Sequence, residues 1–471
     1  MRIKATDTVG IALVACTFTA VYLHERGGHK ESHLSPVVDA GGATTSAETV
    51  PTFAFVNFNV VPMDGQDVLN NHVVVVRNGF VTAVGPVGVV EAPAEAILVD
   101  GGGSGFLVPG LVDAHVHIVD AGEDLLPLFI ANGVTTVFNL KGDDRHLDLR
   151  DRARQPGFEG PTIFTAGPFV PEGVELSPAD ARREVEAQAD AGYDFIKIHG
   201  ALSSAAYAAL TQAASDRRIA VIGHAPRGLP FSEVLANGQV AIVHADQLIY
   251  PGLQTLDSTQ AASVGADMAA AGMWLTPTVS GFGNVLAQWA SPEGLARRMA
   301  ETETRYLPSS LRRAWNTSDI YVGQPRRERA RIEEMHRFLA PLVRTMNRAG
   351  VRILAGTDAL QPGMVPGFSL HDELDALEAL GMSPVDVLAA ATVNAGRFVR
   401  GNIDSTALFG TIETGARADI LVVEHDPRSD LRTLRRPLGV MVRGEWYDRA
   451  RLDLILSRAL GAPIADDMTP Q

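Results

Sequence analysis

Four histidines, a lysine and an aspartate in this sequence could together hold two divalent metal ions. They are His115, His117, Lys197, His224, His244 and Asp358. All but Asp358 lie within or at the end of a short apolar, β-branched run, and Asp358 follows such a run closely. Charge in a buried run is costly unless it is paired or bound to metal. A metal site explains all six residues at once and predicts a hydrolase.

His115 and His117 lie two residues apart on an expected strand, so both imidazoles point to one face. That spacing suits two ligands of one ion. The pattern H-x-H is common by chance, but here it follows the segment P-G-L-V-D-A. Asp113 shares the same face, and we expect its carboxylate to orient one of the imidazoles.

Lys197 differs from the other five residues because an ammonium group has no lone pair and cannot bind a metal. It stands in the run F-I-K-I, which is typical of a buried strand. A neutral lysine there could react with CO₂ to give a carbamate, which adds one negative charge and two oxygens able to bridge two cations. The alternative is a lysine that forms an ion pair inside the fold.

His224 and His244 each end a strand-like run, and Asp358 follows another. A lone histidine at such a place is more often structural, and a lone aspartate is a common helix N-cap. As parts of a six-residue pattern, the two histidines are expected to bind the second ion. Asp358 is expected to bind metal and to accept a proton from the attacking water. Metal binding lowers the pKa of water to roughly 7, so hydroxide would be available at ordinary pH.

Alternation of strand-like and helical stretches over residues 107–400 predicts an α/β protein with a parallel sheet. The number of units fits a (β/α)8 TIM barrel, with a doubly wound open sheet as the alternative. The β-type runs at 51–106 and 401–450 are expected to pair as one small β-sandwich domain. Residues 282–347 interrupt the repeat and predict a helical insertion, which would act as a lid or as an oligomer contact.

The two ends of the chain carry other signals. Arg2 and Lys4 precede the apolar run 9–23, so residues 1–23 resemble an export signal or a membrane anchor, with a buried N-terminal helix as the alternative. The segment L-V-A-C ending at Cys16 resembles a bacterial lipoprotein cleavage box. Residues 24–50 are expected to be a flexible linker and 451–471 a C-terminal tail. We therefore expect an exported protein that is periplasmic, secreted or membrane-anchored.

Bulk composition limits the partners of this 471-residue chain. A hydrophobic content of 46% supports a large core, and a net charge of −15 argues against a nucleic-acid partner. Cys16 is the only cysteine, which excludes an intrachain disulfide. We expect a small-molecule substrate, and the sequence leaves open whether the chain forms a homo-oligomer.

The motifs P-G-L-V-D-A-H-V-H, F-I-K-I, G-H-A-P, I-V-H-A, A-G-T-D and G-T-I-E-T-G-A-R-A-D-I-L-V-V follow one another in this order. In this the chain closely resembles the metal-dependent amidohydrolase superfamily, over about residues 53–447. The lysine-containing pattern resembles the imidazolonepropionase- and prolidase-like branch. The resemblance implies two divalent ions, most often zinc. The more buried ion would be held by His115 and His117 and the more exposed one by His224 and His244, with carboxylated Lys197 between them.

Two departures from the family pattern affect the substrate side. Val243 replaces the glutamate that usually precedes the second exposed-metal ligand, and Pro226 and Arg227 replace a tyrosine found in peptidase-like members. Arg227 is expected either to bind a substrate carboxylate through a bidentate contact or to pair with a surface acid. His199 would contact the oxyanion or support a metal ligand. Tyr250 and His371 also stand near expected strand ends, as weaker candidates.

These observations predict a binuclear metal-dependent hydrolase that cleaves a carbon–nitrogen amide bond. The resemblance implies attack by a metal-bridging hydroxide, with Asp358 as the general base that passes the proton to the leaving amine. The expected substrate is an Xaa-Pro-like dipeptide or an N-acyl amino acid. The alternatives are hydrolysis of a lactone, a cyclic imide or a phosphotriester, and a non-catalytic exported metal-binding protein.

Overall fold

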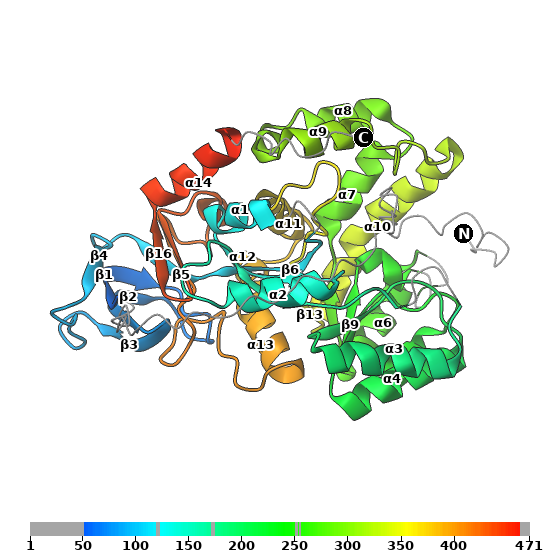
Figure 1. Cartoon of the computed structure of the whole chain (residues 1–471), viewed down its shortest axis with the longest axis horizontal. Coiled ribbons are helices and arrows are strands. Elements are labelled where there is room, and N and C mark those ends of the chain that lie inside the picture. Colours follow the sequence, from blue (N-terminus) through cyan, green and yellow to red (C-terminus); the bar gives the residue numbers. More distant parts are fainter. Residues whose placement is uncertain (1–50, 119–122, 171–174, 250–252, 254–255, 462–471) are drawn as a thin grey trace, which may run out of the picture.

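The computed structural model describes residues 51–118, 123–170, 175–249, 253 and 256–461. The predicted export segment 1–23, the linker 24–50 and Cys16 lie outside the described residues, as does Tyr250. Within the described part, the predicted α/β class is confirmed (Figure 1). No described helix combines the length and the apolar character needed to cross a bilayer.

The centre of the chain forms two parallel sheets. The first contains β6 (Leu111–Val116), β7 (Val134–Asn139) and β8 (Thr162–Thr165). The second contains β9 (Phe195–Ile198), β10 (Ala220–Gly223), β11 (Ala241–Val243), β12 (Trp274–Thr276) and β13 (Arg352–Ile353). Isolated parallel bridges join the sheets on both sides, between Val116 and Ala359 and between Ala166 and Phe195. The arrangement is consistent with the predicted barrel, although neither described sheet is closed.

Helices follow these strands in the manner of repeated βα units. Those outside the insertion are α1 (Leu126–Ala131), α2 (Asp144–Ala153), α3 (Pro178–Ala191), α4 (Ser204–Arg217), α5 (Phe231–Ala236), α6 (Ser258–Ala270), α11 (Phe368–Ala379), α12 (Pro384–Ala390), α13 (Val393–Asn402) and α14 (Arg449–Gly461). Local sequence sets several boundaries. For example, the Ser177 side chain accepts from the Asp180 amide at the start of α3, and Gly192 adopts the left-handed conformation at its end.

The segment between β12 and β13 is helical. It contains α7 (Val279–Gln288), α8 (Pro292–Met299), η4 (Thr302–Tyr306), α9 (Ser309–Asn316), η5 (Arg326–Glu328) and α10 (Arg329–Arg348). In Figure 1, α8 and α9 lie at the top of the molecule. The segment packs on the rest of the fold, because α7 contacts α11, α10 contacts α6 and η4 contacts α14.

The β-rich segments from the two ends of the chain form one mixed sheet, at the left in Figure 1. Its strands are β1 (Phe53–Val60), β2 (Leu69–Arg77), β3 (Phe80–Pro86), β4 (Ile97–Asp100), β5 (Phe106–Pro109), β14 (Ile420–Val423), β15 (Gly439–Val442) and β16 (Glu445–Asp448). The predicted β-sandwich is therefore not confirmed. Side chains alternate along β14: Ile420 and Val422 join the sheet's own core, whereas Leu421 and Val423 join the main core. The alternation shows two buried faces but not what covers them.

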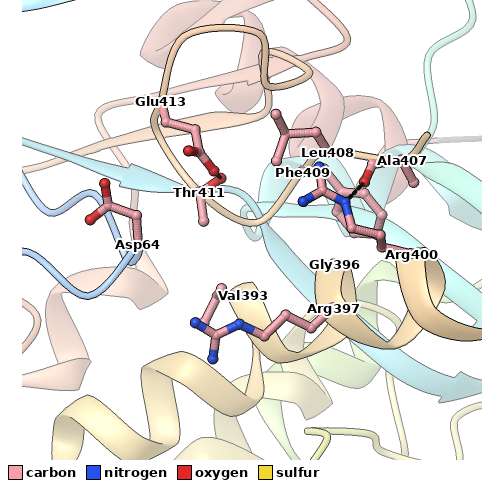
Figure 2. Close-up of a pocket in the computed structure, with 10 residues that line it drawn as sticks. All are labelled: Asp64, Val393, Gly396, Arg397, Arg400, Ala407, Leu408, Phe409, Thr411 and Glu413. Carbon is pink, nitrogen blue, oxygen red and sulfur yellow. Dashed lines mark hydrogen bonds between the residues drawn. The ribbon is translucent and has the colours of Figure 1, made fainter. Parts of the chain in front are cut away.

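A cleft lies at the junction between this sheet and α13 (Figure 2). Arg397 and Arg400 of α13 line it on one side, and Asp64 and Glu413 line it on the other. Arg397 also lines a second cleft with Arg352, which begins β13. The second cleft therefore lies at the N-terminal ends of β12 and β13.

Candidate metal centre

The end of β6 brings two imidazoles together. The exposed fraction is 0% for His115 and 7% for His117. The Nε2 atoms of the two rings lie 3.3 Å apart. Asp358 completes the group, because its Oδ1 lies 3.1 Å from Nε2 of His115 and 2.8 Å from Nε2 of His117. Residues 241 positions apart in sequence thus converge on one point, as the sequence predicted.

The backbone around Asp358 is held against β6. The Asp358 amide donates to the His115 carbonyl at 2.8 Å, and Asp358 has a φ of 67°. That left-handed conformation is uncommon for a residue other than glycine and is often found at functional sites. Two residues earlier, a Cβ on Gly356 would lie 2.9 Å from the His115 amide nitrogen. A glycine is therefore required for this close approach, which explains the glycine in A-G-T-D.

His244 reaches the same group from the end of β11. The ligand atoms of His244, His115 and Asp358 all lie within 4.8 Å of one another. Nδ1 of His244 lies 2.7 Å from Oγ1 of Thr278. Both residues have positive φ, 71° for His244 and 49° for Thr278. The threonine hydroxyl therefore fixes the ring, with Nε2 available for a metal.

The remaining predicted residues continue this cluster. The ring of His224 lies 5.1 Å from that of His244 and 4.5 Å from that of His199, centroid to centroid. His199 in turn stacks on Phe169 at 4.3 Å. Lys197 is 1% exposed in β9, where it pairs in register with Ile222, two residues before His224.

Burial disfavours the protonated form of three of these imidazoles, those of His115, His224 and His244. Burial lowers the pKa of His115. Burial also lowers the pKa of His224, helped by His199, and lowers that of His244 to about 4, against the attraction of Asp358. Neutral imidazoles have a lone pair to offer, so these histidines are in the protonation state that a metal needs.

Asp113 departs from its predicted role. Its carboxylate accepts from the His115 amide at 3.2 Å, from the Thr357 amide at 3.0 Å and from the Thr357 hydroxyl at 2.7 Å. It therefore orients the backbone that carries the ligands rather than an imidazole ring. Strand alternation predicted the correct face for Asp113, but it did not reveal that backbone amides would donate to its carboxylate.

The substrate-side candidates have different positions. Arg227 forms no side-chain ion pair or hydrogen bond within the described part of the chain, and its charge helps burial to lower the pKa of His199 and of His224. His371 instead lies in α11, with Nε2 3.0 Å from the Asn132 carbonyl oxygen. The described contact of His371 is thus with Asn132 and not with a residue of the imidazole cluster. Nothing is described for Tyr250.

Several residues of this site were missed by sequence reasoning. Thr278 touches His244, Phe169 stacks on His199, and the amide of Gln361 donates to Oδ2 of Asp358. Glu373 is fully buried and accepts from the amides of Val279 and Ser280 at the start of α7. Thr278 and Gln361 follow an expected strand and the A-G-T-D motif closely, which is the only signal that could have found them.

The donor atoms fit a divalent metal ion. Zinc bonds to nitrogen or oxygen of about 2.0–2.2 Å in a tetrahedron place neighbouring ligand atoms about 3.3 Å apart. The separations among Nε2 of His115, Nε2 of His117 and Oδ1 of Asp358 are 3.3, 3.1 and 2.8 Å. Nδ1 of His115 and of His224 have no hydrogen-bond partner among the described residues. The cluster is therefore a site that could bind a metal.

A profile of the Amidohydrolase family matches residues 106–447, which confirms the resemblance found in the sequence. The match covers both parallel sheets and returns to the end of the small sheet. That family comprises hydrolytic enzymes acting on carbon–nitrogen bonds and typically using divalent metals, so the predicted class of enzyme is confirmed at family level.

Individual proteins support the same fold. A prolidase candidate from Bifidobacterium longum is 25% identical, with a TM-score of 0.65, over 87% of this chain and 99% of that chain. The Aspergillus niger ochratoxinase is 34% identical over 94 residues, which cover 20% of this chain and 18% of that enzyme. The ochratoxinase structure has a TM-score of 0.61 at 17% identity, over 84% of this chain and 96% of that chain, and shows the shared fold alone.

Proposed function

Because this chain belongs to the amidohydrolase family, we propose that it is a binuclear metal-dependent hydrolase of amide bonds in dipeptides or N-acyl amino acids. One observation carries the proposal: Nε2 of His115, Nε2 of His117 and Oδ1 of Asp358 lie within 3.3 Å of one another. We also infer that the two parallel sheets form one (β/α)8 barrel, because bridges join them on both sides.

Zinc suits this set of nitrogen and carboxylate donors. Two such ions would supply Lewis acidity and a reactive water. His115, His117 and Asp358 would hold one of them, and His224 and His244 would hold the other. Lys197 would lie between them as a carbamate, formed when its neutral Nζ attacks CO₂ and loses a proton. The buried strand position of Lys197 supports this, because burial disfavours an ammonium ion.

Asp358 would act as the general base. Water adds to the carbonyl carbon and its proton passes to the Asp358 carboxylate, which then delivers it to the leaving nitrogen as the carbon–nitrogen bond breaks. The products are a carboxylate and an amine. The backbone contact between the Asp358 amide and the His115 carbonyl keeps this base beside the imidazoles throughout.

Arg227 would bind the free carboxylate of the substrate. Its guanidinium has no ion-pair partner among the residues that the structure describes, and its charge is felt by His199 and His224. An unpaired arginine beside the cluster suits a ligand that carries a carboxylate. His199, whose Nε2 is buried without a described hydrogen-bond partner, would contact the oxyanion or support a metal ligand.

The test is to remove metal from the purified protein with a chelator and to assay a panel of Xaa-Pro dipeptides and N-acyl amino acids. We expect hydrolysis that is lost on chelation and restored by Zn²⁺. The panel includes a lactone, a cyclic imide and a phosphotriester. Amide hydrolysis that survives complete metal removal, or turnover of the non-amide compounds alone, would contradict the proposal.

A further inference from the structure

Gln361 connects the proposed catalytic base to the helical insertion. Its side chain is fully buried, its Nε2 donates to Oδ2 of Asp358, and its Oε1 accepts from the Tyr321 hydroxyl at 2.7 Å. Tyr321 belongs to the insertion, between α9 and η5, and is 2% exposed. We propose that Gln361 is a positioning residue for Asp358 and that Tyr321 fixes its orientation. This inference rests on the proposed function, in which Asp358 is the base.

The two contacts of Gln361 select one orientation of its amide. An ionised carboxylate only accepts hydrogen bonds, so the end that faces Asp358 must be the NH₂ group. The carbonyl end then needs a donor, which the Tyr321 hydroxyl supplies. If the amide were flipped, its carbonyl oxygen would face the Asp358 carboxylate, and two hydrogen-bond acceptors would repel each other. The relay therefore holds Oδ2 in place and leaves Oδ1 directed at His115 and His117.

Helix α7 of the insertion forms hydrogen bonds with the same loop at the next residue, Pro362. The side-chain amides of Asn284 and Gln288 both donate to the Pro362 carbonyl, at 3.0 and 2.8 Å. Both amides are buried, and Gln288 also donates to Oδ1 of Asn284 at 2.9 Å. The insertion thus forms hydrogen bonds with two successive residues of the loop after Asp358, Gln361 and Pro362. Its role in the proposal is to hold the base in position.

Three variants separate positioning from general stability. Gln361→Met keeps the length of the side chain but removes both hydrogen bonds, and Tyr321→Phe removes only the far hydroxyl. Tyr306→Phe is the matched control, because Tyr306 lies in the same insertion, is 8% exposed and stacks on Phe368. Its hydroxyl accepts from Arg305 and has no described contact with Asp358 or Gln361.

On the best amide of the panel, we expect Gln361→Met to lower kcat by about 10- to 100-fold, the range for a hydrogen bond to a charged group. KM should stay within about twofold, since the substrate-binding residues are unchanged. Tyr321→Phe should give a smaller loss of kcat, and Tyr306→Phe none. Wild-type kcat in both Gln361→Met and Tyr321→Phe would overturn the proposal. If Gln361→Met fails to fold, Tyr321→Phe decides the question alone.

A second readout does not depend on catalysis. Each protein is titrated with Co²⁺, whose visible absorption reports the ligands around it. We expect Gln361→Met to change this spectrum or to speed Co²⁺ release, because the Asp358 carboxylate loses the hydrogen bond from the Gln361 amide. Tyr306→Phe should match the wild type. If both the spectrum and the rate of Co²⁺ release are unchanged in Gln361→Met, the proposed role of Gln361 is overturned, whereas a wild type that hydrolyses no amide would overturn the proposed function instead.

Discussion

The contact between Thr278 and His244 gives the sharpest prediction about the metal site. A histidine that binds metal through Nε2 must carry its proton on Nδ1, and Nδ1 of His244 lies 2.7 Å from the Thr278 hydroxyl. Thr278→Val keeps the shape and β-branching of the side chain, so the unusual backbone at this position (φ 49°) is equally strained in both proteins. The variant therefore removes the hydrogen bond alone.

The size of the effect follows from burial. Thr278 is 2% exposed and the contact is partly buried, so water would replace the hydroxyl only incompletely at the Nδ1–H of the metal-binding tautomer. An unsatisfied buried donor costs about 1–3 kcal/mol. A tenfold change in affinity corresponds to about 1.4 kcal/mol. The cost of the lost hydrogen bond therefore agrees with the roughly 10- to 100-fold loss of metal affinity that is typical when such a supporting contact is removed.

The assay is a Zn²⁺ competition titration against a chromophoric chelator at pH 7.5. Thr211→Val is the matched control: Thr211 is 7% exposed, lies in α4, and its hydroxyl donates to the Tyr207 carbonyl, away from the imidazoles. We expect one of the two Zn²⁺ ions to bind about 10- to 100-fold more weakly in Thr278→Val and normally in Thr211→Val. Equal affinities in both variants would refute the reasoning.

Three further predictions concern other parts of the molecule. Lys197→Ala should lose bound metal and activity, with partial rescue by small carboxylic acids that replace the carbamate; a variant with full activity would show that no carbamate is needed. Arg227→Met should raise KM about 10- to 100-fold for substrates with a free carboxylate and leave KM for their methyl esters unchanged; an equal effect on both would exclude carboxylate binding. Burial raises the pKa of Glu373 from 4.5 to about 7 against the backbone hydrogen bonds at Ser280 and Val279. Because the folded state binds this proton more tightly than the unfolded state, the free energy of unfolding should fall as pH rises from about 4.5 to 7, by up to about 3 kcal/mol relative to Glu373→Gln. Urea unfolding at several pH values measures this difference, and a constant offset between the two proteins would contradict the burial of an ionisable Glu373.

The sequence revealed the residues whose chemistry is tied to a strand end. His115 and His117 were found because strand alternation puts both on one face, and Asp358 because a carboxylate after a buried run needs a partner. The parallel sheets followed from the repeated alternation of strand and helix. These signals are local, so a single sequence contains them.

What the sequence could not reveal depends on distant contacts. Nothing in the composition of the insertion indicates that Tyr321 would meet Gln361, 40 positions away. The predicted β-sandwich is not confirmed: alternation along β14 shows that both faces of this strand are buried, with one set of side chains in the sheet's own core and the other in the main core. Asp113 was placed on the correct face, yet its partners are backbone amides that only the folded chain brings within reach.

The most direct measurement is anomalous X-ray scattering at the zinc edge from crystals grown with Zn²⁺ and bicarbonate. We expect two peaks, one in contact with His115, His117 and Asp358 and the other with His224 and His244, and density extending from Nζ of Lys197 between them. If no zinc peak lies at these side chains while zinc is bound elsewhere on the molecule, the proposed metal site is wrong.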